Sequence, residues 1–256
     1  MHSDTYPLLR KPLFSVLGAL QVGSSDTSAA VSGRRAQRLL LLLLSAANQP
    51  VCADQLIDGV WDGSPSPTAT SNLRVLVWRW RKALPATADG GERIPRTPGG
   101  YRIVVGRDEL DAFHFEDLVD TAHRAAASGD HHLAEVTFRT ALQLWRGTAY
   151  PDLTTAAAQS AALEEKRRQA MDGLVSVLLG QGRHSEAIPL LRGLTVASPH
   201  DEHSCERLMV ALCRCGRRGD ALAVYQQAQT FLARDFGVRP TRRLQVLRRT
   251  IEAADR

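Results

Sequence analysis

The chain has 256 residues, which is enough for two domains of ordinary size, each with its own core. Hydrophobic residues make up 44% and charged residues 23%, a globular composition that argues against a disordered chain. The formal net charge of +5 is unevenly distributed: residues 1–107 carry 13 Lys/Arg against 7 Asp/Glu, and residues 108–256 carry 19 against 20. The first part is therefore the better candidate for binding nucleic acid, and the second part should have a role that needs no cationic surface.

Targeting signals and a disulfide framework are not evident. The N-terminus lacks a basic segment followed by an apolar stretch, and the longest apolar run, Leu39–Leu44, is far shorter than the ~20 residues needed to cross a bilayer. Four cysteines at positions 52, 205, 213 and 215 are too few and too irregularly spaced for a set of disulfides. We expect a cytoplasmic, nucleoid-associated protein with no membrane partner.

The first 62 residues predict two short strands followed by two helices. Phe14–Gly18 and Leu20–Val22 have strand composition, and Gly23–Ser28 has turn composition. A continuous apolar block over Arg34–Ala47 predicts a helix that is buried on more than one side. A shorter amphipathic helix is predicted over Ala53–Trp61.

A third helix and a hairpin complete the first part. Ser66 is a suitable N-cap and Pro67 a suitable first helical residue, so this helix is expected to run from there to about Leu84. Residues Ile94–Val105 predict a hairpin with its turn at Pro98–Gly100. The order of strands, three helices and hairpin is that of a winged helix-turn-helix.

The third helix has a core stripe and an outward face of different chemistry. At about 100° per residue, Leu73, Val77, Trp80 and Leu84 share one narrow stripe. The outward residues, which we propose as the recognition surface for DNA, are Ser71, Asn72, Arg74, Val75, Trp78, Arg79 and Lys82. Asn can bind adenine, Arg can bind guanine and Lys can neutralise phosphate. A solvated basic face is the alternative. Trp78 itself could pack on thymine methyl groups or sugar, or lie against the hairpin.

Two further segments could contact the DNA backbone. In the hairpin, a tight glycine turn lets the backbone approach a phosphate or a minor groove, and the expected contact residues are Arg96, Thr97, Gly99, Gly100 and Arg102. At the start of the first helix, Arg34, Arg35 and Arg38 are expected to meet phosphate, which a helix N-terminus also favours.

Beyond Asp108 the strand signals end and a repeated pattern begins. Gly129–Ala134, Gly182–Ala187 and Gly219–Ala221 each combine a glycine, a polar stretch and an alanine before an amphipathic run. Ala187 and Ala221 are 34 residues apart, the tetratricopeptide period, although the first interval is 53 residues. Helix pairs stacked into a short solenoid would explain the pattern, and such arrays usually bind other proteins.

Together these segments resemble the streptomycete antibiotic regulatory protein (SARP) family of bacterial activators. The matching residues, in chain order, are Asp54–Trp61, Asn72–Val77, Arg79–Leu84, Thr97–Arg102, Asp111, Phe115–Val119, Ala141–Gly147, Gly182–Ala187 and Phe236–Pro240. The resemblance implies a mainly α chain: an OmpR-type winged helix-turn-helix, as in two-component output domains, over residues 1–107. A bacterial transcriptional activation domain of tetratricopeptide-like helices over residues 108–256 would follow.

The resemblance also implies a function. Family members bind direct repeats in double-stranded DNA near the −35 region and recruit RNA polymerase holoenzyme, including its sigma factor, typically at antibiotic gene clusters. Head-to-tail self-association on DNA is implied by the direct repeats. No cofactor is implied. The sequence has neither an ATPase module nor a receiver domain, so it resembles the short form of the family.

Three residues depart from the family pattern. Trp80 occupies a position where the family usually has Leu, so the core around it should be repacked. Trp78 lies at a variable position on the presumed DNA face, so an operator sequence cannot be transferred from relatives. Cys52 replaces the usual Ser or Thr helix cap, which should weaken the start of the second helix.

Two other classes of function compete with this interpretation. An enzyme is not expected, because the sequence lacks a glycine-rich phosphate loop, HExxH and G-x-S-x-G. Zinc is also not expected. The candidate ligands are His200, His203, Cys205, Cys213 and Cys215, but Cys213 and Cys215 would point about 200° apart on a helix, so buried small side chains are the plainer interpretation. The pair His131–His132 is expected at the surface.

A helical-repeat scaffold that binds a peptide, with a non-specific DNA-binding or dimerisation domain at its N-terminus, is the remaining alternative. The concentration of positive charge in residues 1–107 argues against it.

Overall fold

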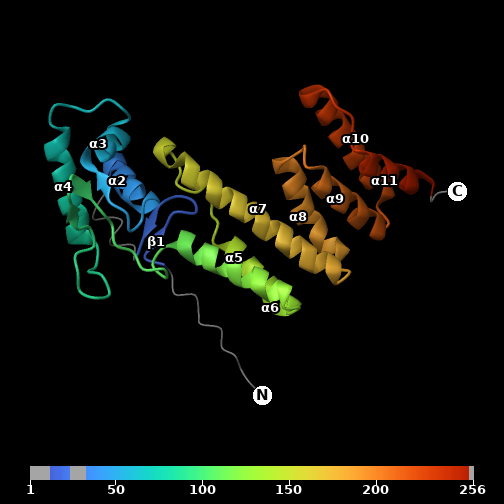
Figure 1. The fold of residues 1–256 in the computed structure, drawn as a ribbon, viewed down its shortest axis with the longest axis horizontal. Coiled ribbons are helices and arrows are strands. Elements are labelled where there is room, and N and C mark those ends of the chain that lie inside the picture. The colour runs from blue at the N-terminus through green and yellow to red at the C-terminus, as the bar shows by residue number, and fades with distance from the viewer. Residues whose placement is uncertain (1–11, 24–32, 254–256) are drawn as a thin grey trace, which may run out of the picture. The chain divides into compact units, whose positions relative to one another are not determined.

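The computed structural model describes residues 12–23 and 33–253 and divides the chain into two compact units (Figure 1). The first unit combines the chain up to Leu118 with Gln143–Lys166, and the second combines Val119–Leu142 with Arg167–Arg256. Helices α5 (Asp111–Ala127) and α7 (Ala157–Gly180) therefore contribute residues to both units, and the last residue of α6 (His131–Gln143) belongs to the first unit. The expected domain boundary between residues 107 and 108 remains a prediction, because the compact units interleave along the chain.

Three helices form the centre of the first unit. They are α2 (Arg34–Ser45), α3 (Ala53–Trp61) and α4 (Ala69–Ala83), which lie together in Figure 1. All six leucines of the 39–44 run are buried, as expected for a helix covered on more than one side. At Gly59 a side-chain Cβ would lie only 2.8 Å from Leu42 Cδ1, so the glycine lets α3 approach α2 closely.

Short antiparallel strands complete the first unit. Strand β1 (Phe14–Ser15) pairs with β2 (Gln21–Val22) in the register Phe14↔Val22, which confirms the two expected strands. A second sheet has the order β3-β5-β4, formed by Val51–Cys52, Gly100–Tyr101 and Arg96–Thr97. Strand β3 was not expected from the sequence. The expected turn over Gly23–Ser28 lies, past Gly23, outside the described residues.

Helix α4 starts later than the sequence indicates. Its N-cap is Thr68, whose carbonyl accepts from the Asn72 N–H at 2.9 Å, and not Ser66. The Ser66 hydroxyl lies 3.2 Å from the Thr68 hydroxyl, and the Ser66 carbonyl accepts from the Ala69 N–H in a turn. The expected Ser66–Pro67 start is therefore wrong, because these residues form a turn that precedes the helix.

The second unit is helical. Along the chain it contains the second part of α5, α6 (His131–Gln143) up to Leu142, the second part of α7, and four further helices. These are α8 (His184–Ala197), α9 (Glu202–Arg214), α10 (Arg218–Phe236) and α11 (Arg242–Ala253). The 3-10 turn Thr154–Ala156 precedes α7 in the first unit. Among the described residues, no helix is both long and apolar enough to cross a membrane.

Helix pairs in the second unit share one turn geometry. Gly129, Gly182 and Gly216 each adopt a positive φ, between +73° and +84°, in the turn between two helices. Five residues after each glycine stands an alanine that is fully buried: Ala134, Ala187 and Ala221. The third copy of the sequence pattern is wrong by one turn, because Gly219 lies inside α10 and Gly216 is the turn residue. The corrected spacing of glycine to alanine is identical in all three pairs.

Candidate nucleic-acid interface

The inward side of α4 fixes the orientation of its outward side. Leu73, Val77, Trp80 and Leu84 are at most 7% exposed, which confirms the predicted core stripe. The indole N–H of Trp80 donates to the Ala36 carbonyl of α2 at 2.8 Å, so this large side chain is buried with its polar atom satisfied. The tryptophan in the core thus adds a directed contact between α4 and α2.

The outward side of α4 carries seven exposed side chains. They are Ser71, Asn72, Arg74, Val75, Trp78, Arg79 and Lys82. Three of them, Arg74, Arg79 and Lys82, have no ion-pair or hydrogen-bond partner for their side chains among the described residues. Ser71 and Asn72 each bond to Thr68 in the first turn, at 2.8 and 3.1 Å. The face is therefore polar and cationic, with its charges free to meet a polyanion.

Two large apolar side chains interrupt this cationic face. Val75 is 49% exposed and Trp78 is 59% exposed, and they lie three residues apart on the same side of the helix. More than half of the Trp78 surface is thus open, and the two packing interpretations drawn from the sequence remain predictions. An exposed tryptophan between unpaired cations is typical of a surface that something else covers.

Arg81 differs from the other basic residues of α4 because its side chain has partners within the fold. Its Nε and Nη2 donate to the Ile94 carbonyl at 2.9 and 2.6 Å, and its guanidinium lies 5.8 Å from the centre of the Tyr101 ring. Glu92 is also within 3.0 Å. Arg81 thus ties α4 to the hairpin. The sequence did not reveal this role, because Arg81 stands within the basic run 79–82.

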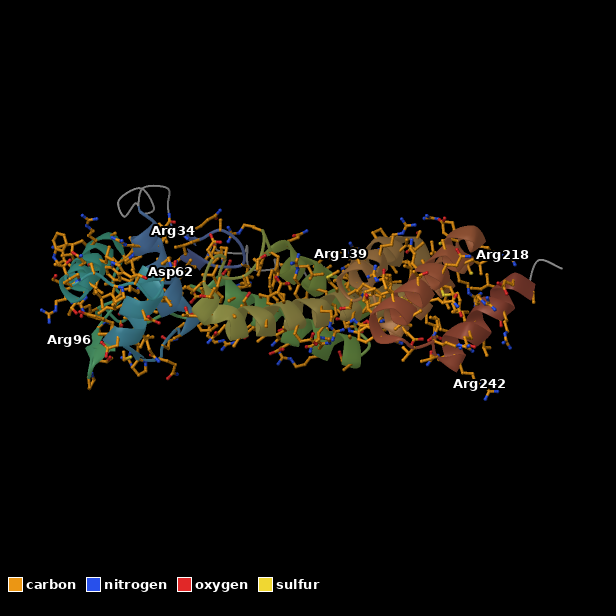
Figure 2. All side chains as sticks on the ribbon, turned by 90° about the horizontal axis from the view of Figure 1, so that it is seen from above. Arg34, Asp62, Arg96, Arg139, Arg218 and Arg242 are labelled. Atoms are coloured by element: carbon orange, nitrogen blue, oxygen red, sulfur yellow. The ribbon has the colours of Figure 1, made fainter. Side chains whose placement is uncertain are left out.

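The hairpin presents part of the expected contact set. Arg96, Gly99 and Arg102 are exposed, and Figure 2 shows Arg96 projecting outward from β4. Gly99, at a φ of +80°, forms the turn together with Pro98. Thr97 is half-buried, and its hydroxyl has no hydrogen-bond partner among the described residues.

Gly100 has a different role from the expected one. It is buried within β5, where a Cβ would lie 1.9 Å from the Val51 carbonyl oxygen. The glycine is therefore required for β5 to pair with β3. The turn consists of Pro98 and Gly99, and a contact of Gly100 with DNA remains a prediction.

The N-terminal turn of α2 offers two of the three expected arginines. Arg34 and Arg35 are exposed, and the Arg35 guanidinium lies 5.5 Å from the centre of the Trp61 ring. The N-cap is Gly33, which has no side chain to cap the first N–H groups of this helix.

Arg38 is not available to DNA. It is 6% exposed, and both of its terminal nitrogens donate to the Asp62 carboxylate, just past the end of α3. These hydrogen bonds, together with the charge of Arg38, hold the pKa of Asp62 below its usual value. The expected phosphate contact at Arg38 is therefore corrected, because its guanidinium joins α2 to the residue that follows α3.

A buried ion pair supports the hairpin from behind. The guanidinium of Arg93, 4% exposed, bonds both oxygens of Glu109 at 2.6 and 2.9 Å and the Val104 carbonyl at 2.9 Å. It also donates to the carbonyls of Pro85 and Ala86. Burial raises the pKa of Glu109, but the hydrogen bonds from Arg93 and the Gly106 N–H, together with the charge of Arg93, outweigh burial and lower that pKa. The pair fixes the loop after α4 to the segment that follows the hairpin.

The cysteine and histidine residues considered as zinc ligands do not converge. Cys205 is buried, and burial raises the pKa of its thiol to about 11. Cys213 is half-buried and Cys215 is exposed, so the interpretation as buried small side chains is wrong for Cys215. No metal-binding arrangement of His, Cys, Asp and Glu occurs in the part of the chain that the structure describes. His131 and His132 are exposed, as expected.

Comparison with known families agrees with this architecture. Residues 30–103 match the family described as "Transcriptional regulatory protein, C terminal", and residues 110–252 match the "Bacterial transcriptional activator domain". Among solved structures, Mycobacterium tuberculosis EmbR, in complex with a low-affinity phosphopeptide, superposes with a TM-score of 0.80 at 28% identity. That match covers 94% of this chain and 65% of EmbR. The predicted winged helix followed by a helical activator domain is thereby confirmed.

Sequence relatives identify the group of regulators. Regulatory protein DnrI of Streptomyces peucetius is 32% identical over 250 residues, covering 94% of this chain and 92% of DnrI. Regulatory protein AfsR of Streptomyces griseus is 34% identical over 244 residues, and the chain spans 24% of its length. Transcriptional regulator RedD of Streptomyces coelicolor is 30% identical, with 88% of this chain and 66% of RedD covered. The chain belongs to the SARP family of DNA-binding transcriptional regulators.

Proposed function

We propose that this chain is a transcriptional activator that binds direct repeats near the −35 region and recruits RNA polymerase holoenzyme. Its targets would be promoters of a secondary-metabolite gene cluster. The observation that carries the proposal is the outward face of α4. Its unpaired cations Arg74, Arg79 and Lys82 surround two exposed apolar side chains, on a helix whose opposite side is fully fixed in the core.

Each part of this face suits a different feature of the major groove. Arg79 has the fork of donors that binds guanine O6 and N7, and Asn72 has the amide that binds adenine. Val75 and Trp78 offer apolar surface to thymine methyl groups, and Lys82 offers a point charge to phosphate. The residues that contact bases would give sequence specificity. Lys82 and Arg74 would add affinity that does not depend on the DNA sequence.

The hairpin and the start of α2 would hold the duplex on either side of α4. Arg96 and Arg102 on the hairpin are exposed and unpaired among the described residues, and Gly99 lets the turn approach a backbone. Arg34 and Arg35 stand in the first turn of α2, after an N-cap glycine without a side chain, and a helix N-terminus favours phosphate. Thr97 remains a proposed contact at the edge of this surface.

The helical domain is proposed to act on the transcription machinery. Its match to the bacterial transcriptional activator domain spans residues 110–252, which leaves DNA recognition to the preceding part of the chain. Binding to direct repeats would place two copies head to tail, and self-association would then form on the DNA.

The test is a footprint of the full chain on promoters at two salt concentrations. Protection of two tandem half-sites about one helical turn apart would support the proposal. Salt-sensitive binding without discrete protection would instead indicate non-specific binding and favour a protein-binding scaffold.

Two variants separate base reading from phosphate binding. Arg79→Ala should weaken operator binding by about 1–3 kcal/mol and relax sequence preference. Lys82→Ala should weaken binding to operator and scrambled DNA alike and reduce the salt slope by about 1. If Arg79→Ala lost the same affinity for both DNAs, Arg79 would have no role in base recognition.

A further inference from the structure

Helix α11 has one face in the core and an opposite face without a partner. Leu244 and Ile251 are 1% and 6% exposed and anchor the helix. At about 100° per residue, Arg242, Val246 and Arg249 fall within one narrow arc on the far side of the helix from these two. We call these three residues the Arg–Val stripe. All three are exposed.

Only two arginines of this region, Arg243 and Arg248, are paired with described carboxylates, those of Glu206 and Glu252. Residues 237–251 contain five arginines and no Asp or Glu. The neighbouring carboxylates of α9 are engaged elsewhere: Glu202 accepts from the Thr241 N–H and hydroxyl at 2.7 Å, and Glu206 pairs with Arg243 at 2.7 Å. Within residues 12–23 and 33–253, no side chain pairs with Arg242 or Arg249. Figure 2 shows Arg242 projecting away from the ribbon of α11.

Apolar side chains are also exposed on α11 and in the residues just before it. Val246 is 51% exposed, and Phe236 and Val238, which lead into α11, are 58% and 49% exposed. Three of the five large apolar side chains exposed in the described part of the second unit thus stand within eleven residues of the chain. Phe236 is held in place by Phe231, with ring centres 5.9 Å apart.

The near-neutral total charge of residues 108–256 does not reveal that arginines are concentrated in and just before α11. The sequence average indicates a part that needs no cationic surface, but the averaging combines α11 with the carboxylate-rich helices before it. The surface that results is both cationic and apolar.

We propose that the Arg–Val stripe, with Phe236 and Val238, docks a segment of RNA polymerase holoenzyme that combines carboxylates with apolar side chains. The proposal rests on the proposed function and assigns the polymerase contact to α11. Carboxylates would pair with Arg242 and Arg249 while apolar side chains cover Val246. Arginine and exposed apolar side chains together are typical of protein interfaces. DNA phosphates would satisfy the arginines but leave the valine and phenylalanine uncovered.

The test measures binding of purified holoenzyme to the immobilised full chain, without DNA, next to operator affinity and activation in purified transcription. We expect the double variant R242E/R249E to lose at least tenfold in holoenzyme binding and in activation, with operator affinity within twofold of wild type. Val246→Ser keeps every charge and should lose about threefold in holoenzyme binding. Circular dichroism melting curves would show that both variants fold.

A matched control has the same change in net charge elsewhere. Arg124 and Arg214 are exposed arginines of α5 and α9, so R124E/R214E should keep wild-type holoenzyme binding. Equal losses in the control would overturn the proposal, as would unchanged holoenzyme binding in R242E/R249E. Loss of operator affinity in R242E/R249E without loss of holoenzyme binding would also overturn it and make the stripe a DNA contact.

The outcomes also separate this proposal from the proposed function. If the wild-type chain gave no footprint but bound holoenzyme through the stripe, the docking surface would stand and DNA recognition would fail. If the wild-type chain gave a footprint but did not bind holoenzyme, the docking proposal and polymerase recruitment would both fail, and DNA recognition would stand. If wild type and R242E/R249E bound holoenzyme equally well, the docking proposal alone would be overturned.

Discussion

The two compact units use arginine differently. In the first unit, four exposed arginines on α4 and in the hairpin have no carboxylate partner among the described residues: Arg74, Arg79, Arg96 and Arg102. Arg81 of α4 is the exception, because it pairs with Glu92. In the second unit, at least half of the described arginines are paired with carboxylates of its own helices; the pairs include Arg139 and Arg183 with Glu135 and Glu186, Arg207 with Asp172, and Arg217 with Asp220. A surface that can bind a polyanion is therefore identified by basic residues without carboxylate partners, and not by the total number of basic residues.

Each unit also contains arginines that depart from this contrast, and these show what pairing with a carboxylate does. Arg38 and Arg93 in the first unit are buried on carboxylates and join segments of the fold. Arg242 and Arg249 on α11 are unpaired, among the described residues, in a unit where pairing is common. A paired arginine should therefore affect stability, and an unpaired one should affect binding.

The largest expected effect is on the buried pair behind the hairpin. Glu109→Gln removes the carboxylate from Arg93 and leaves a buried guanidinium without a counter-charge, which should destabilise the first unit by about 3 kcal/mol. All four tryptophans lie in this unit, so urea denaturation followed by tryptophan fluorescence measures the loss.

The same pair predicts a pH dependence. The pKa of Glu109 is lowered in the folded state, so its contribution is complete above the ordinary carboxylate pKa and is lost as pH falls through the lowered value. The difference in unfolding free energy between wild type and Glu109→Gln should therefore shrink in acid. A difference that stays constant from neutral pH to acid would contradict the assignment.

Trp78 tests the binding side of the comparison. Trp78→Ala should leave stability unchanged, because the side chain is 59% exposed, but weaken operator binding by about 1–2 kcal/mol. Replacing operator thymines by deoxyuridine removes only the methyl group. In a titration followed by fluorescence anisotropy, wild type should bind the operator more weakly once the contacted thymine is replaced. Trp78→Ala should bind the replaced and the original operator almost equally well. Equal sensitivity of both proteins to deoxyuridine would place Trp78 away from thymine, and Val75→Ala is the neighbouring comparison.

The helices of the first unit could be predicted because their signals are local. The bounds of α3 and the core stripe of α4 follow from apolar spacing within one turn or two, and both are confirmed. The outward face of α4 follows from the same periodicity, and its seven residues are exposed as expected.

The contacts that were missed join residues far apart in the chain. Arg38 meets Asp62, 24 residues later, and β3 meets β5 through Gly100, so no local pattern distinguishes Arg38 from Arg34 or Gly100 from Gly99. In the second unit, Gly216 and Gly219 are both near a helix start, and only the positive φ of Gly216 identifies the turn. Charge averaged over a domain likewise hides a single basic helix.

A smaller effect is expected from the ion-pair network of the second unit. Glu135 is 12% exposed and accepts from both Arg139 and Arg183, and the hydrogen bond from Arg183 is the main cause of its lowered pKa. Glu135→Gln should destabilise the second unit by about 1 kcal/mol. Urea curves followed by far-UV circular dichroism should shift while tryptophan fluorescence does not. Reduced operator affinity in this variant would contradict the view that paired arginines affect stability and unpaired arginines affect binding.

The smallest expected effect concerns the start of α3, which positions α4 without touching DNA. Cys52 is the N-cap, and its Sγ accepts from the Gln55 N–H at 3.4 Å, the weak hydrogen bond of a poor acceptor. Cys52→Ser places a stronger acceptor on a backbone that already has the extended conformation of an N-cap, so the first unit should gain about 0.5 kcal/mol in urea denaturation with operator affinity unchanged. Cys52→Ala is the control and should fall below wild type. If serine gave no gain, the side-chain cap would contribute nothing at this position, and the carboxylate of Asp54 in the first turn would be the main stabiliser of this helix end.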